Sequence, residues 1–266
     1  MNDLKGKVAF ITGGAQGIGL GMARAMKQEG AVLVLVDIDD DALAAARDEL
    51  GAHTYNLDVR DRDAYARVVD EVESSIGPIA ILCNNAGVGG GASVTSMTYE
   101  MWDWVLGVNN GGVVNGIQTI VPRMVERGDG HIVNTASGAG LVSTDGTGFM
   151  YNMSKYAVVG LSECIRYDLE KRGIGVSVLC PGPVATKIFE HTEAGRPDQR
   201  ELTGKQRESF ERTNQWLQTK GTPPDDVGHM VVDGIKSNAL YIHTDRAVER
   251  AVLKRAERIV AAMPDA

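Results

Sequence analysis

Tyr151 and Lys155 are the residues of this chain whose types and spacing most clearly indicate chemistry. They lie four residues apart in a stretch with helical periodicity, from Met150 to Arg172, so their side chains share one face of a helix. A free phenol has a pKa near ~10 and is a poor acid–base group at neutral pH. A neighbouring ammonium group favours the phenolate and lowers that pKa, so the pair could exchange a proton with an alcohol or a ketone.

A second pair in the same helix, Tyr167 and Lys171, has the same spacing. At about 100° per residue, Tyr167 lies about 160° around the helix from Tyr151 and ~24 Å along its axis. The two Tyr–Lys pairs therefore cannot both belong to one site. Tyr151 lies near the helix start, on the side of the carboxyl end of the preceding strand, where open α/β sheets bind ligands. We therefore predict that Tyr151 does the chemistry and that Tyr167 is structural.

A glycine-rich turn from Thr12 to Gly19 follows the first apolar segment and precedes a helical one. Glycines in such a turn let the backbone approach a pyrophosphate closely, and the amides at the start of the helix face its negative charge. The alternative of a nucleoside triphosphate-binding P-loop fails, because no Lys-Ser or Lys-Thr pair follows Gly19. The turn predicts a dinucleotide site formed by Gly13, Gln16, Gly17, Ile18 and Gly19.

Asp37 ends the second apolar segment, 18 residues after Gly19. An acid at about this spacing accepts hydrogen bonds from the adenosine ribose hydroxyls and repels a 2′-phosphate. No Lys or Arg stands at positions 13–19 or at Ile38 to pair with such a phosphate. This pattern favours NAD over NADP, although Asp37 could instead be a helix-capping or loop residue.

The elements that must position these residues are short apolar strands that alternate with helices. Six strands are expected by residue 180, at 8–11, 31–36, 53–57, 79–83, 131–135 and 175–180, and a seventh at 239–243. Helices are expected at 17–30, 40–50, 61–76, 99–126, 150–172, 223–237 and 246–262. This alternation predicts an α/β fold, a doubly wound parallel (Rossmann-type) sheet of about seven strands in a single domain, 1–266.

The segment from Thr186 to Lys220 is polar and irregular, and we expect a substrate lid there, with two short helices. The chain has a formal net charge of −8 and no basic run, which disfavours nucleic acid as a partner. No apolar run reaches the roughly 18 residues of a membrane span. The three cysteines and five histidines have no metal-ligand spacing, so no metal site is expected. The cysteines fit reduced thiols, and we expect a cytoplasmic location.

Taken together, these motifs resemble the short-chain dehydrogenase/reductase family over nearly the whole chain. Further segments add to the resemblance: Asp58-Val59, Asn84-Asn85-Ala86-Gly87, Asn109 within 108–112, Ser137, and Pro181 to Thr186. The resemblance implies that Ser137, Tyr151, Lys155 and Asn109 are catalytic: Ser137 binds the substrate oxygen, Lys155 also holds the nicotinamide ribose, and Asn109 supports a proton-relaying water. To the turn residues and Asp37 it adds these cofactor contacts: Asp58, Val59, Asn85, Ala86, Gly87, Tyr151, Lys155, Pro181, Gly182, Val184 and Thr186.

The chain departs from the family pattern in one spacing. Ser137 and Tyr151 are 14 positions apart where the family usually has 13, which indicates one residue inserted between Gly138 and Phe149. Ser143 and Ser154 are the weaker alternatives to Ser137, and Asn110 is the alternative to Asn109.

The function implied is NAD-dependent interconversion of a secondary alcohol and a ketone, by a homo-oligomer, dimer or tetramer, built through the helices around 99–126 and 150–172. The segments 102–109 and 238–242 are similar to a branch that includes dehydrogenases of lignin-derived aryl carbinols, so an aromatic or bulky apolar carbinol is the expected substrate. A non-catalytic dinucleotide-sensing regulator on the same fold and an NADP-linked ketone reductase remain alternatives.

Overall fold

The structure is a computed structural model that describes residues 1–90, 94–143, 148–198 and 204–264. Seven strands form one parallel sheet in the order β3-β2-β1-β4-β5-β6-β7. They are β1 (Val8–Thr12), β2 (Val32–Asp37), β3 (His53–Asn56), β4 (Ile79–Asn84), β5 (Gly130–Thr135), β6 (Ile174–Cys180) and β7 (Tyr241–His243). The predicted α/β doubly wound fold of about seven strands is confirmed.

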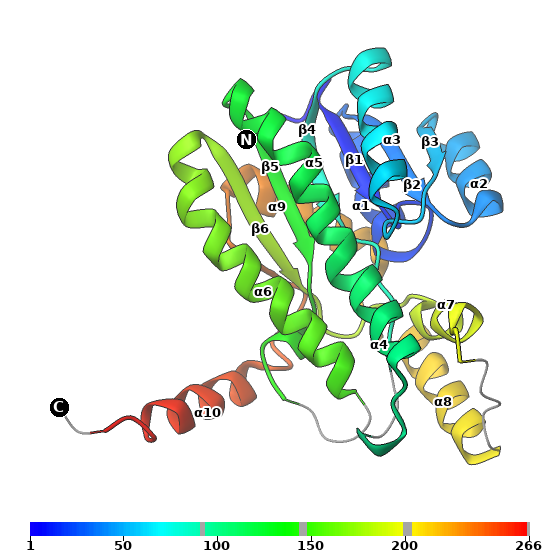
Figure 1. The fold of residues 1–266 in the computed structure, drawn as a ribbon, viewed down its shortest axis with the longest axis vertical. Coiled ribbons are helices and arrows are strands. Elements are labelled where there is room, and N and C mark those ends of the chain that lie inside the picture. The colour runs from blue at the N-terminus through cyan, green and yellow to red at the C-terminus, as the bar shows by residue number, and fades with distance from the viewer. Residues whose placement is uncertain (91–93, 144–147, 199–203, 265–266) are drawn as a thin grey trace.

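Helices cover both faces of the sheet (Figure 1). One layer contains α1 (Gly17–Gln28), α2 (Asp40–Leu50) and α9 (Pro224–Ser237), and the other contains α3 (Arg62–Ser75), α5 (Gly112–Arg127) and α6 (Phe149–Leu169). The central strands are buried on both sides, as their continuous Val, Ile and Leu runs predict. The strand order reverses between β1 and β4, and in open α/β sheets such a switch point opens a crevice at the carboxyl ends of the strands.

The long helix expected at 99–126 is three consecutive pieces. They are α4 (Tyr99–Leu106), a π-helical turn (Gly107–Gly111) and α5. A π turn widens a helix locally and is frequent at functional sites. This one carries Asn109, one of the predicted catalytic residues.

The segment expected to form a lid contains α7 (Ile188–Gly195) and α8 (Gly204–Lys220). Two helices were predicted there, but α8 has 17 residues and is longer than expected. Residues 199–203, between them, lie outside the described residues, as do residues 144–147 of the loop before α6.

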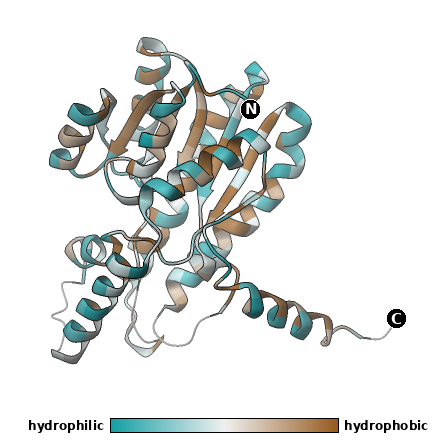
Figure 2. Ribbon diagram, turned by 180° about the vertical axis from the view of Figure 1, so that it is seen from behind, coloured by the Kyte–Doolittle hydropathy of each residue, from teal (hydrophilic) through white to brown (hydrophobic). Residues whose placement is uncertain are grey.

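The last helix, α10 (Glu249–Val260), extends away from the rest of the molecule (Figures 1 and 2). None of its residues is buried. Among the described residues, no helix is both long and apolar enough to cross a membrane.

Candidate active site

The glycine-rich turn between β1 and α1 leaves a cradle that side chains would fill. Gly13 and Gly17 have φ angles of 59° and 52°, in the left-handed region that favours glycine. A Cβ on Gly19 would lie 2.0 Å from the Gly13 carbonyl oxygen, so that position tolerates no side chain. The turn before α1 is therefore bare backbone at these positions, which fits the close approach of a pyrophosphate.

The turn is held by the end of β4. Thr12 Oγ1 accepts hydrogen bonds from the backbone amides of Asn85 and Ala86, at 2.9 and 3.0 Å. Asn85 Nδ2 donates to the carbonyl oxygens of Thr12 and Gly13. The Asn85 side chain thus braces the turn. Sequence reasoning did not identify the hydroxyl of Thr12, which joins the two strand ends.

Asp37 lies at the end of β2 and faces the turn. Its carboxylate accepts hydrogen bonds from the backbone amides of Ala15, Ile38 and Asp39. Burial raises its pKa, against the effect of these hydrogen bonds. The N-cap of α2 is Asp39, which accepts from Ala42 N, so Asp37 does not cap that helix.

Two further predicted cofactor contacts have partners within the protein. Gln16 Nε2 donates to Asp39 Oδ2 at 2.7 Å. Asp58 accepts from the guanidinium of Arg60, with Nε at 3.0 Å from both carboxylate oxygens, and this hydrogen bonding lowers the pKa of Asp58. Arg60 itself packs on the π turn, with its Cδ 3.2 Å from the position of a Cβ on Gly107. The family pattern contained no signal for this arginine.

Ser137, Tyr151 and Lys155 come together at the carboxyl end of β5. The Ser137 side chain lies close enough to the Tyr151 phenol to lower the pKa of Tyr151. Lys155 Nζ lies 5.6 Å from the centre of the Tyr151 ring and donates to Thr135 O at 3.0 Å. Tyr167 is 76% exposed, outside this group. The extra residue between Ser137 and Tyr151 therefore does not separate the two side chains.

Burial shifts the pKa values of both Tyr151 and Lys155. It raises the pKa of Tyr151, with the Ser137 side chain acting in the opposite direction. It lowers the pKa of Lys155 from 10.5 to about 8. The expectation that Lys155 lowers the Tyr151 pKa is therefore wrong for the protein alone, because both groups lose solvation and the ammonium is directed toward Thr135 O.

Asn109 is a positioning residue in this geometry. Its Oδ1 accepts from Val88 N at 2.8 Å, and its Nδ2 donates to Val88 O and to Ser154 Oγ, both at 3.0 Å. A Cβ on Gly87 would lie 3.3 Å from both Asn109 Oδ1 and Lys155 Nζ, so Gly87 keeps this space open. The water relay remains a prediction.

The alternative residues have other positions. Asn110 Nδ2 donates to the backbone oxygen of Ser154. Ser154 is buried and donates its hydroxyl to Tyr151 O, which makes it a helix-packing residue. Ser143 is exposed.

The segment from Pro181 to Thr186 joins the catalytic group to the cofactor turn. Pro181 O accepts from Gly138 N at 2.8 Å, next to Ser137. At the other end, the Thr186 methyl group lies 3.3 Å from the position of a Cβ on Gly17. Val184 between them is buried. A dinucleotide that lay across the crevice would thus meet this segment along its length.

An apolar cluster adjoins Tyr151 on the side of the lid. Met101, Trp104, Val105 and Met150 are buried there, and the rings of Trp102 and Phe149 lie 5.8 Å apart. Helix α7 closes over it: Thr192 Oγ1 accepts from Gly89 N at 2.7 Å, and Gly195 lies against the Trp104 ring. Sequence reasoning had not identified Thr192.

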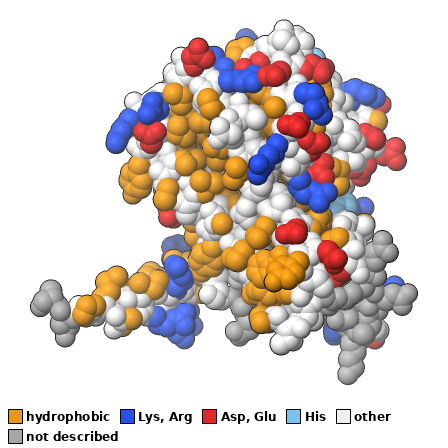
Figure 3. All heavy atoms as spheres, viewed as in Figure 1, with side chains coloured by type: hydrophobic (Ala, Val, Ile, Leu, Met, Phe, Trp, Pro, Cys, Tyr) orange, Lys and Arg blue, Asp and Glu red, His pale blue; other side chains and the backbone are white. Residues whose placement is uncertain are grey.

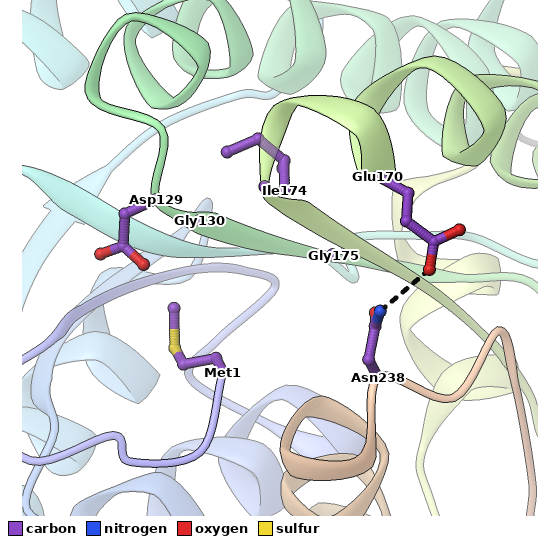
Figure 4. A pocket seen from close by; sticks show the side chains of 8 residues that line it. Met1, Asp129, Gly130, Glu170, Ile174, Gly175 and Asn238 are labelled. Carbon is purple, nitrogen blue, oxygen red and sulfur yellow. Dashed lines mark hydrogen bonds between the residues drawn. The ribbon is translucent and has the colours of Figure 1, made fainter.

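A pocket of about 160 Å³ lies at the opposite ends of the strands (Figure 4). Gly130 and Ile174, the first residues of β5 and β6, line it together with Asp129, Glu170 and Asn238, whereas the catalytic group lies beyond the last residues of these strands. The pocket is therefore separate from the chemistry. The described residues contain no group of three or more His, Cys, Asp or Glu side chains that could hold a metal ion.

Three features define an oxidoreductase that uses a nicotinamide dinucleotide: the glycine-rich turn after β1, Asp37 at the end of β2, and the group of Ser137, Tyr151 and Lys155. The family model described as short chain dehydrogenase matches residues 7–197, and the chain belongs to this family. It is 38% identical to the C alpha-dehydrogenase of Sphingobium sp. (strain NBRC 103272 / SYK-6), over 98% of this chain and 87% of that protein.

Two solved structures extend the comparison. The chain is 34% identical to a short chain dehydrogenase/reductase from Burkholderia phymatum in complex with NAD, with a TM-score of 0.90 and 100% of both chains covered. It is also 34% identical to the apo form of LigD from Sphingobium sp. strain SYK-6, with a TM-score of 0.82, over 99% of this chain and 100% of that one. The resemblance to the branch of aryl-carbinol dehydrogenases is confirmed.

Proposed function

We propose that the protein oxidises a secondary alcohol to a ketone with NAD, reversibly, and that Tyr151 is its acid–base group. The observation that carries this proposal is that the buried Lys155 lies 5.6 Å from the centre of the Tyr151 ring, with Ser137 close enough to affect the pKa of the phenol. Binding a dinucleotide needs no such group, so these residues disfavour a purely regulatory role.

In this reaction Ser137 positions the substrate oxygen next to the Tyr151 hydroxyl, and Tyr151 takes the alcohol proton or returns it to the ketone. When bound, the nicotinamide supplies the chemistry of hydride transfer. Lys155, with a pKa of about 8, can exchange a proton with Tyr151 at mildly alkaline pH. Ser137 is held by the loop that Pro181 O anchors, so the donor and the acid–base group have fixed positions.

The preference for NAD over NADP rests on Asp37. The carboxylate lies beside the turn with its pKa set by burial and three backbone amides, and the neighbouring side chain is that of Ile38, which is exposed. A ribose diol can donate to this carboxylate, whereas a 2′-phosphate would meet its negative charge without a compensating base.

For the substrate we propose an aromatic or bulky apolar carbinol. The apolar cluster next to Tyr151 contains Trp102 and Phe149 at its edge, and α7 covers it. Rings of this kind favour offset or edge-to-face contact with another ring.

We further propose that the protein acts as a homo-oligomer. The outer row of α6 is apolar along its length and faces solvent: Met153, Ala157, Leu161, Cys164 and Tyr167. Met153 is 43% exposed, and a Cβ on Gly160 would meet nothing within 4 Å. Exposed apolar rows of this length indicate a protein interface.

The reaction is tested with a panel of secondary alcohols at alkaline pH, followed by NADH formation, and with the corresponding ketones in reverse. With an active substrate, Tyr151→Phe should lower kcat by at least ~10²-fold, because a positioned proton-transfer group contributes about that much. Its affinity for NADH, measured by fluorescence, should be retained. Tyr167→Phe, with the same spacing to a lysine, is the matched control. Loss of activity in Tyr167→Phe but not in Tyr151→Phe would show that the site is misassigned.

A further inference from the structure

Within the part of the chain that the structure describes, helix α10 touches α6 through Arg255 but buries none of its own residues. All of its residues from Glu249 to Val260 lie outside the buried core, and Leu253 and Val260 are 60% and 63% exposed. A helix of 12 residues is marginal in water unless it packs an apolar face against something. Figure 2 shows hydrophobic and hydrophilic residues alternating along it, on a segment that extends far from the sheet.

The apolar residues of this helix form one stripe. Their spacing of three or four residues places them on one side of the helix, which continues into the turn that follows: Val252, Leu253, Ala256, Ile259, Val260 and Met263. The opposite side carries Arg250, Lys254 and Arg258. This is the pattern of a helix that buries one face and leaves the other in water.

The charge of the helix is opposite to that of the molecule. Residues 246–260 contain five basic residues, Arg246, Arg250, Lys254, Arg255 and Arg258, and two acidic ones, Glu249 and Glu257. The whole chain has a net charge of −8, so the remainder is more acidic still. A basic helix with an apolar stripe is thus complementary to the acidic body of a second copy.

A membrane surface fits this helix less well. Helices that lie in the interface carry Trp, Phe or Leu on their apolar face, whereas residues 246–260 contain one leucine and no aromatic side chain. Anionic lipids would also repel the acidic remainder of the chain. A second copy of the chain would cover the apolar stripe and would attract the basic helix through its own negative charge.

The base of α10 contacts segments beside the active site. Thr244 Oγ1 accepts from Gly182 N at 2.9 Å, and Val248 Cγ1 lies 3.1 Å from the position of a Cβ on Gly138, the residue after Ser137. Arg255 then packs over the Tyr156 ring of α6, at 5.1 Å from its centre. The helix therefore leaves the molecule at the end of α6 that carries Met153.

The stripe and the outer row of α6 bound the same side of the molecule. In Figure 3, hydrophobic side chains lie along the arm and on the flank above it, where Figure 1 places α6 and α5. A second copy seated on this flank would also reach the arm. In a two-fold dimer the same contact occurs twice, so each copy would hold the other.

We propose that α10 is an exchanged arm, which packs its apolar stripe on the α5–α6 flank of a second copy of this chain. Because the base of the arm touches Gly138, docking of the arm also supports the loop that holds Ser137. The inference stands on the exposed helix and its charge, and does not depend on the proposed reaction.

The test compares two double variants of the full chain. Leu253→Gln with Val260→Gln places two polar side chains in the stripe, and Ala251→Gln with Ala262→Gln places two on the opposite side without changing the charge. Sedimentation of serial dilutions should show the dimer of the stripe variant dissociating at least about tenfold more readily, about 1.4 kcal/mol. The control variant should match the unmodified protein. Retained NADH binding and circular dichroism would show that the stripe variant is folded.

A photo-reactive amino acid in place of Leu253 gives the second readout. In a mixture of two differently tagged copies, it should cross-link one tag to residues of α5 or α6 that carry the other tag. Cross-links confined to one chain would overturn the proposal, as would equal dissociation of both variants. A protein that stays monomeric and floats with anionic phosphatidylglycerol vesicles through α10 would show that the arm binds membranes instead.

Discussion

Lys155→Met should make the folded protein more stable at neutral pH while it removes activity. The ammonium is 3% exposed, and burial lowers its pKa from 10.5 to about 8. Each pKa unit corresponds to about 1.4 kcal/mol, so keeping this lysine charged costs the folded state about 3 kcal/mol. Methionine keeps the unbranched shape without the charge, and the lost hydrogen bond to Thr135 O offsets about 1 kcal/mol of the gain.

The sign of the effect follows from the lowered pKa. Below about pH 8 the lysine is charged in both the folded and the unfolded protein, so the full cost is present. Above pH 10.5 it is neutral in both states, and the cost is gone. The free energy of unfolding of the unmodified protein should therefore rise by about 3 kcal/mol relative to the variant as the pH increases through this interval.

Urea unfolding at a fixed protein concentration, at a series of pH values, measures this difference. Other titrating groups are common to both proteins and cancel. Lys171→Met, which changes an exposed lysine after the same helix, is the matched control and should show no such dependence. A Lys155→Met variant whose stability differs from that of the unmodified protein by the same amount at every pH would refute the argument from burial.

Three further predictions concern the cofactor and the lid. The unmodified protein should prefer NAD by at least about tenfold in kcat/KM, about 1.4 kcal/mol, and Asp37→Ser with Ile38→Arg should move this preference toward NADP; equal use of both cofactors by the unmodified protein would contradict it. Thr192→Val removes the acceptor of the Gly89 amide and keeps the side-chain shape, so KM for the alcohol should rise about fivefold, about 1 kcal/mol, with kcat little changed; an unaltered KM would count against α7 as a cover. Hydrogen exchange in α7 and α8 should be faster than in the sheet and should slow when NADH and a substrate analogue bind, and full protection in the free protein would argue against a lid.

The fold was predictable from the sequence because its signals are local. Short Val- and Leu-rich runs such as Val32–Asp37 have one strongly preferred structure when helices separate them. The choice of Tyr151 over Tyr167 rested on helix geometry and on the position of the carboxyl ends of the strands, and Tyr167 is exposed outside the group of Ser137, Tyr151 and Lys155. The limits of the elements were less certain, as the shorter β7 and the π turn at Gly107–Gly111 illustrate, because packing decides where a strand or a regular helix ends.

The parts of the site that sequence reasoning missed depend on contacts between distant segments. Thr192 meets Gly89 across 103 positions, and no spacing rule connects them. Arg60 is two positions from Asp58, but no sequence pattern predicted that its guanidinium binds that carboxylate. Its side chain also packs on Gly107, which is distant in the sequence. The effect of Lys155 on the pKa of Tyr151 was predicted wrongly for the same reason, since burial of both groups is a property of the folded chain.

The extra residue between Ser137 and Tyr151 shows why loop length is a weak guide to this site. Ser137 is fixed at its own end: its Oγ accepts from Ala139 N, and Gly138 N donates to Pro181 O. Tyr151 is fixed by α6, which packs against β6 and against the turn at Gly138–Gly140. Neither set of contacts involves residues 144–147, so the number of residues between Ser137 and Tyr151 can change while both side chains keep their positions. Variation in this loop should therefore alter what approaches Tyr151 before it alters the proton transfer itself.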